Sequence, residues 1–317
     1  MKKVIRLLIG GCFILSAVSK LFSMEGFELY IFSFGLAGFD LCSFAARLIV
    51  IAEFLLGAAL ASGLYFRTTR VLTALTLAGF TLFLTWRAML GDKESCHCMG
   101  DLVDLNPVQS IIKNLALGAM LAWCWKSPDS ETAYKNIISA ATAIVATALV
   151  FCITPPDLFF RKGRVSEDLS TEKFMPIADS LGLSSGRKAI CFYSASCEHC
   201  RHCASKIAGI IRRHDLPLES FPIVFMQTNE KQDSVSAAFF REYGEQVVLP
   251  YSYLHPYTFL PITNGSMPLV VLFENGQKIK EYDYLSIDEK EIVSFIRPLY
   301  KDSPKSSRNF FARSSCQ

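Results

Sequence analysis

The chain has 317 residues, of which 51% are hydrophobic and 19% charged, and its mean hydropathy is +0.31. This composition excludes a disordered protein and argues against an ordinary soluble one. The 32 basic and 29 acidic residues leave a net charge of +3, so no basic excess points to nucleic acid as a partner. The charges are uneven, with 22 in residues 1–155 and 39 in residues 156–317. We therefore expect a membrane-embedded first half and a globular second half.

Five apolar stretches of the first half approach the length of about 20 residues that crosses a bilayer. They cover residues 4–22, 44–64, 71–90, 107–125 and 136–154. The basic start Met1-Lys2-Lys3 and the segment Ala17-Val18-Ser19 also fit a cleaved signal peptide. Because further spans follow closely, an uncleaved first helix is the simpler interpretation.

Basic residues in the short loops predict the orientation of these spans. They precede span one, lie between spans two and three, and lie between spans four and five: Lys2, Lys3, Arg6, Arg67, Arg70, Lys126 and Lys135. All three segments fall on one side, which we assign to the cytoplasm together with the N-terminus. An odd number of spans then carries the second half to the periplasmic, extracytoplasmic side. We expect a multi-pass protein of the inner (cytoplasmic) membrane, embedded in the lipid bilayer.

The second half alternates strand and helix patterns after a polar segment. We predict strands at 188–194 and 222–228, helices at 200–214 and 234–245, a hairpin of 269–274 with 278–284, and a helix at 287–300. The hairpin turns through Asn275-Gly276, a strong turn dipeptide. The tail that follows is polar, and we expect it to be flexible.

One motif in this half carries cysteine chemistry. The segment Ser194-Ala195-Ser196-Cys197-Glu198-His199-Cys200 follows an apolar strand and opens a predicted helix. A thiol at a helix start faces the positive end of the helix dipole and nearby N–H groups, and both favour the thiolate. We expect Cys197 to attack and Cys200 to resolve the mixed disulfide, with His199 making the pair more oxidising. A structural zinc pair or an inert disulfide is the alternative.

The segment from Arg187 to Tyr300 resembles the thioredoxin fold, because its order of strand, CxxC, helix, strand, helix, hairpin and helix fits that family. Gly265-Ser266-Met267-Pro268, directly before the strand at Leu269, resembles the family's cis-proline loop. The resemblance implies that Pro268 and the backbone of Met267 form a substrate platform, with a cis bond that is otherwise unusual. Residues 247–261 exceed what a minimal thioredoxin needs, and the sequence assigns them no role.

A third cysteine extends the motif. Cys203 lies one helical turn beyond Cys200, and with His199 and His202 it would allow a metal site. The simpler interpretation is that Cys203 is a semi-buried small residue, and we expect no bound metal. The sequence does not settle the roles of six cysteines, which are Cys12, Cys42, Cys124, Cys152, Cys203 and Cys316.

The second motif, Ser95-Cys96-His97-Cys98-Met99-Gly100, lies in the predicted outer loop after span three. A CxC disulfide closes a small strained ring, and strained disulfides are the labile, exchanging kind. The two cysteines could instead bind a metal with His97, or pair with Cys42 or Cys152, which we expect at a similar depth.

The first 125 residues resemble the DoxX-like superfamily, and especially the MauE family. The resemblance rests on residues 16–22 and 30–36, on Glu53 and Gly57, on the Cys96-His97-Cys98-Met99-Gly100 loop, and on residues 106–114. Met99 stands where that family has Phe. The resemblance implies a four-helix membrane domain associated with disulfide formation in exported proteins. That domain is topologically like the four-helix disulfide-generating membrane proteins that pass electrons to quinone.

Charged residues inside spans are costly and point to function. Glu53 lies in mid-span, and we expect either a hydrogen bond between helices or a role near a bound quinone or proton path. Lys20, Arg87 and Lys113 lie near the outer boundary, where a long side chain can reach the interface. Lys113 would also favour a thiolate of Cys96 or Cys98.

These observations predict a multi-domain chain: an α-helical transmembrane bundle of four MauE-like helices and a fifth helix, followed by an α/β thioredoxin-like domain. The expected ranges are 1–125 for the four-helix domain, 126–155 for the fifth helix, 156–186 for a linker, 187–302 for the thioredoxin-like domain and 303–317 for the tail.

The hypothesis that unites the two motifs is a thiol–disulfide oxidoreductase. Cys197–Cys200 would oxidise exported cysteine-containing proteins, Cys96–Cys98 would re-oxidise that pair, and a quinone would accept the electrons. Two alternatives remain. One is a reductive relay that keeps outer thiols reduced; it needs a cysteine pair that the cytoplasm can reach, and only Cys12 and Cys124 are candidates. The other is a membrane-anchored metal-binding module.

Overall fold

The protein is described by a computed structural model that covers residues 2–89, 106–128, 134–159, 172–178, 182–183, 185–228, 232–243 and 247–297. The chain divides into two compact units, Met1–Phe160 and Arg161–Gln317. The first unit is helical and the second is built on a sheet, so the predicted fold class is confirmed.

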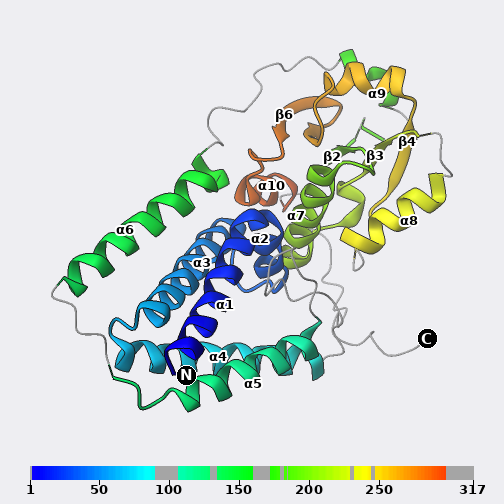
Figure 1. The fold of residues 1–317 in the computed structure, drawn as a ribbon. Coiled ribbons are helices and arrows are strands. Elements are labelled where there is room, and N and C mark those ends of the chain that lie inside the picture. The colour runs from blue at the N-terminus through cyan, green and yellow to red at the C-terminus, as the bar shows by residue number, and fades with distance from the viewer. Residues whose placement is uncertain are drawn as a thin grey trace. The chain divides into compact units, whose positions relative to one another are not determined.

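The first unit contains the helices α1 (Lys2–Phe22), α2 (Met24–Ser33), α3 (Phe39–Ser62), α4 (Phe66–Met89), α5 (Pro107–Trp123) and α6 (Lys135–Ile153) (Figure 1). Of the described helices, α1, α3, α4 and α6 are long and apolar enough to cross a membrane. Many of their large apolar side chains face outward, as expected for surfaces in contact with lipid. The protein is therefore a multi-pass membrane protein.

Two helices of this unit differ from the expected spans. The fourth expected span, 107–125, is present as α5, which has 17 residues. At its start, Asn106 and Gln109 cap each other's backbone N–H groups. At about 1.5 Å per residue it is about 26 Å long, close to the thickness of the hydrocarbon core. Helix α2 was not expected, because only Ser23 separates it from α1 and it continues the same apolar run.

Helices α1 and α3 approach each other closely because glycines meet at their contact. A Cβ atom added to Gly10 would lie 2.6 Å from the carbonyl oxygen of Gly57, and one added to Gly57 would lie 2.8 Å from that of Gly10. Ile9, Phe13 and Leu60 pack beside this contact in an apolar core that also includes side chains of α4 and α5. Backbone packing through small residues is typical of helices in membranes.

The second unit is an α/β domain with one sheet. Its strands are β2 (Arg187–Tyr193), β3 (Ile223–Met226), β4 (Tyr251–Leu254), β5 (Leu269–Glu274) and β6 (Gln277–Asp283), in the order β4-β3-β2-β5-β6. The three strands β2, β3 and β4 are parallel and lie side by side (Figure 1), whereas β5 and β6 are antiparallel to their neighbours. The helices are α7 (Glu198–His214), α8 (Gln232–Tyr243), α9 (Pro256–Thr263) and α10 (Glu289–Ile296).

The stretch 247–261, to which the sequence assigned no role, completes this sheet. It contains the edge strand β4 and the start of α9. A further element, the 3₁₀ helix η3 (Glu172–Ile177), lies within the expected linker. Its residues Phe174 and Ile177 are buried in a core with Phe192, Phe259 and Phe273.

Candidate functional site

The CxxC motif lies at the junction of β2 and α7. Strand β2 is central and buried, and Cys197 is the N-cap residue of α7, with extended backbone angles. The Cys197 side chain is half-buried, whereas Cys200, in the first turn of the helix, is buried. The Ser194 N–H donates to the Cys200 Sγ over 3.4 Å, and Cys200 also has a side-chain hydrogen bond with Cys197. The fold therefore offers one accessible sulfur at a helix start, with a second, enclosed sulfur beside it.

The pKa of the enclosed thiol is strongly shifted. Burial raises the pKa of Cys200 well above its ordinary value, and the hydrogen bond with Cys197 acts in the same direction. Cys200 is therefore a protonated thiol at neutral pH. This asymmetry fits the expected roles of an attacking Cys197 and a resolving Cys200.

A tyrosine and two further cysteines next to the motif in the chain are also buried. The Tyr193 hydroxyl on β2 donates to the Sγ of Cys203 over 3.3 Å. Burial raises the pKa of Cys203 to about 12, and it raises the pKa of Cys191 further. Cys203 is buried completely rather than partly. Its contact with Tyr193, a residue of β2, had no signal in the sequence, because it forms only when α7 packs on the sheet.

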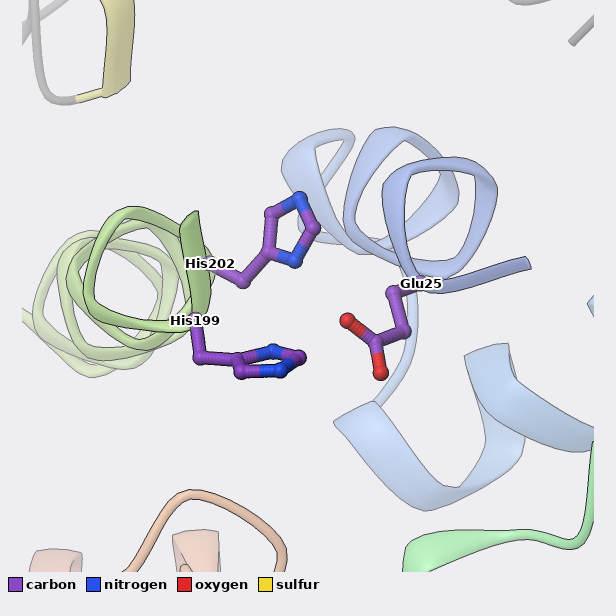
Figure 2. Close-up of side chains that lie close together, drawn as sticks. All are labelled: Glu25, His199 and His202. Carbon is purple, nitrogen blue, oxygen red and sulfur yellow. The ribbon is translucent and has the colours of Figure 1, made fainter. Parts of the chain in front are cut away.

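The two histidines of the motif lie on one side of α7. His199 and His202 project from the same side of this helix (Figure 2). Both rings face Tyr284, with ring centroids 5.3 Å away for His199 and 6.4 Å for His202. His199 is exposed and His202 is half-buried. The expected supporting residue His199 therefore lies beside Cys197 and Cys200 in the helix but packs on an aromatic ring.

The predicted platform residues lie at the same end of β2. The Met267–Pro268 peptide bond is cis, as the resemblance to a cis-proline loop led us to expect. Phe192 pairs with Leu269 across β2 and β5, so the register places Pro268 opposite Tyr193, at the end of the strand from which the CxxC motif continues. Met267 packs on the core of the domain.

In the membrane unit, Glu53 of α3 is joined to α1. Its Oε1 accepts a hydrogen bond from the Nζ of Lys20 over 2.5 Å, and its Oε2 accepts one from the hydroxyl of Ser16 over 3.2 Å. Lys20 is only 2% exposed, so the expectation that its side chain extends to the membrane interface is wrong. Its carboxylate partner lies 33 residues away, and the pair satisfies both charges inside the bundle. Lys113 of α5 is half-buried and interacts electrostatically with Lys20 and Glu53.

A second buried ion pair joins three helices. The Arg47 guanidinium of α3 pairs with Glu28 of α2, and both side chains are almost fully buried. The same guanidinium donates from Nη1 to Ser43 and from Nε to the carbonyl oxygen of Thr154, the residue that ends α6. These bonds fix α2 and the end of α6 to α3.

The structure places some of the other cysteines. Cys96 and Cys98 lie outside the described residues, as does Cys316. Cys12 is half-buried and Cys124 buried in the same apolar core, where they fill space as small side chains. Cys42 is buried, with its Sγ 3.6 Å from the carbonyl oxygen of Ala37, and Cys152 is exposed on α6.

Fold and site together define a multi-pass membrane protein that carries a cysteine pair on a separate α/β domain. The family model "Methylamine utilisation protein MauE" matches residues 1–127, so a MauE-like membrane domain is fused here to a C-terminal domain. The chain is also similar to "Protein TlpB" of Flavobacterium psychrophilum. The two are 25% identical over 337 residues, which is 88% of this chain and 90% of the relative. This similarity extends across both units.

Proposed function

We propose that the protein is a membrane-bound thiol–disulfide oxidoreductase that oxidises exported proteins. The observation that carries the proposal is the half-buried Cys197 at the N-cap of α7, hydrogen-bonded to a buried Cys200. The cis Met267–Pro268 bond at the same end of the sheet supports it, because the thioredoxin-like resemblance assigns substrate binding to that loop. The similarity to a relative over both units supports a joint role for the two units.

The exchange takes place in two displacements. A thiolate of the exported protein attacks the Sγ of Cys197 in the oxidised Cys197–Cys200 pair. The bond between the two sulfurs breaks, and Cys200 leaves with the electron pair and takes up a proton. A second thiolate of the substrate then attacks the mixed disulfide and releases Cys197. The substrate gains one disulfide and the domain holds two thiols.

The membrane domain restores the oxidised pair. Cys197 and Cys200 pass two electrons and two protons to a Cys96–Cys98 disulfide, which becomes a dithiol. A quinone in the bilayer would supply the acceptor for these two electrons and two protons, and the Cys96–Cys98 disulfide would re-form. Because both cysteine pairs belong to one polypeptide, each is present at a high effective concentration for the other. Glu53 and Lys113 would support this step from within the bundle.

The scheme needs both cysteine pairs in one compartment. We place the N-terminus in the cytoplasm and both cysteine pairs on the periplasmic side of the inner membrane, on the basis of the basic residues in the short loops. The partners are then exported cysteine-containing proteins, and no resident metal is required.

The redox state of Cys197–Cys200 in cells tests the proposal. It is measured by an alkylation gel shift in the wild type, in Cys96→Ala and in Cys12→Ala, which removes a half-buried thiol of the membrane unit. We expect an oxidised pair in the wild type and in Cys12→Ala, and a reduced pair in Cys96→Ala. A pair that is reduced in the wild type and oxidised in Cys96→Ala reverses the direction of flow. A pair that Cys96→Ala leaves unchanged refutes the relay.

A further inference from the structure

A groove of about 720 Å³ lies between α4 and α5 in the membrane unit. Small and aliphatic side chains line most of it, and none of the described lining residues carries a charge. The lining includes Ala74, Thr81 and Thr85 of α4, Asn114 and Gly118 of α5, and Trp125.

The polar groups of the groove gather toward one end. Thr85 lies one helical turn before Met89, the last residue of α4, and Asn114 lies two turns into α5. The Asn114 amide nitrogen donates to the hydroxyl of Thr81 over 3.3 Å. Ala74 and Trp125 mark the opposite end. The twelve residues from Ala74 to Thr85 span about 16 Å along α4, at about 1.5 Å for each step between them. The groove is therefore polar at one end and apolar over the rest.

The polar end is also the end nearest the CxC motif in the chain. Helix α4 ends at Met89 and α5 begins at Pro107, so the segment that contains Cys96 and Cys98 joins the two helices of the groove at this end. A ligand whose reactive group occupied the polar end would lie where that segment leaves and re-enters the bundle.

We propose that this groove binds a prenylated quinone, the electron acceptor of the relay; the inference rests on the proposed function and names its acceptor site. A quinone has a flat head with two carbonyl oxygens and a long apolar tail, which matches the distribution of polar and apolar lining residues. A phospholipid headgroup carries a phosphate, and the described lining offers no cation to pair with it.

The polar residues suit both redox forms of such a head. An amide nitrogen carries two hydrogens, so Asn114 can donate to a quinone oxygen while its bond with Thr81 persists. Thr81 and Thr85 donate their hydroxyl hydrogens to backbone carbonyls of α4, which leaves their oxygens as acceptors for the two hydroxyls of a quinol. In the reaction, two S–H bonds break and one S–S bond forms, and the quinone takes up two electrons and two protons.

Two glycines provide a matched pair of variants. Gly118 lines the groove, and a Cβ atom added there meets nothing within 4 Å. Gly79 on α4 has the same open surroundings but does not line the groove. Replacing either glycine by leucine raises the helix propensity of that position by a similar amount. Gly118→Leu therefore fills the groove, whereas Gly79→Leu controls for the added bulk.

The test is quinone binding by the full-length protein in nanodiscs. The probe is a benzoquinone with two isoprene units. Its binding is followed by quenching of the fluorescence of Trp86, which follows Thr85 at the polar end, in a Trp123→Phe/Trp125→Phe background. We expect saturable binding that Gly79→Leu leaves unchanged and Gly118→Leu weakens about tenfold or more. Circular dichroism of each variant verifies that it is folded.

Three results would overturn the site: no saturable binding to the folded background protein, equal binding by the two glycine variants, or equal displacement of the quinone by oleate, which would indicate a general groove for acyl chains. Cys96→Ala should bind the quinone as the wild type does, because none of the described residues that line the groove is a cysteine. If Cys96→Ala leaves the redox state of Cys197–Cys200 unchanged while Gly118→Leu loses binding, the relay fails and the quinone site stands.

Discussion

Replacing Gly10 by alanine should push α1 and α3 apart. The added Cβ atom would lie 2.6 Å from the carbonyl oxygen of Gly57 and 2.9 Å from the backbone nitrogen of Ala61. The first of these distances is about 0.8 Å shorter than ordinary van der Waals contact, and both neighbours are backbone atoms that cannot rotate away. Gly11 is a matched control, because a Cβ atom there meets nothing within 4 Å.

The two substitutions differ only in this contact. Each replaces glycine by alanine inside α1 and so favours the helix by up to about 1 kcal/mol. Gly10→Ala additionally forces a shift between packed helices, which costs about 1–3 kcal/mol. We therefore expect Gly10→Ala to be less stable than Gly11→Ala by about 1–3 kcal/mol.

Denaturation by SDS from mixed micelles, followed by circular dichroism, measures this difference. Equal midpoints for the two variants would refute the argument, since they would show that α1 and α3 do not meet through Gly10. A lower midpoint for Gly11→Ala would contradict it still more directly.

Three further predictions concern buried charges and thiols. Glu53→Gln leaves Lys20 buried opposite a neutral amide and should destabilise the bundle by about 3 kcal/mol in the same SDS assay. The double variant Lys20→Met/Glu53→Gln removes both charges and should recover most of this loss. An unchanged stability of Glu53→Gln would argue against the ion pair. The pKa of Cys203 is about 12 in the folded protein, whereas the ordinary value is 9.0. The folded state therefore holds this thiol proton more tightly than the unfolded state. This contributes about 4 kcal/mol to the free energy of unfolding below pH 9, and the contribution is lost as the pH rises from 9 to 12. Urea unfolding of the full chain should show that loss, and Cys203→Ala should reduce it. Alkylation of the native, reduced protein at pH 8 should modify Cys197 well before Cys200, and equal rates would contradict the burial of Cys200.

Local sequence signals predicted the centre of the second unit well. The apolar run before the CxxC motif forms β2, and the motif opens α7. The Asn275-Gly276 turn also forms as expected, with φ values of 49° and 81° that these two residues tolerate. Such features depend on neighbours in the chain, so a sequence reveals them.

Features that depend on distant partners could not be predicted in this way. Strand β4 has only four residues, is flanked by Pro250 and Pro256, and forms because β3 offers a parallel edge. The position of Lys20 near a helix end suggested exposure, and only the fold brings Glu53 to it. The same holds for Tyr193 and Cys203, whose contact requires α7 to pack on the sheet.

The pairing of α1 with α3 also constrains how the chain enters the membrane. Gly10 meets Gly57 and Lys20 meets Glu53, so the two helices run antiparallel. A lone lysine or glutamate inside an isolated apolar helix opposes insertion, and here Lys20 and Glu53 neutralise each other's charge. Lys20 therefore lacks its carboxylate partner until residue 53 has been synthesised, more than thirty residues later. Stable integration of α1 should thus be a late, cooperative event that waits for α3.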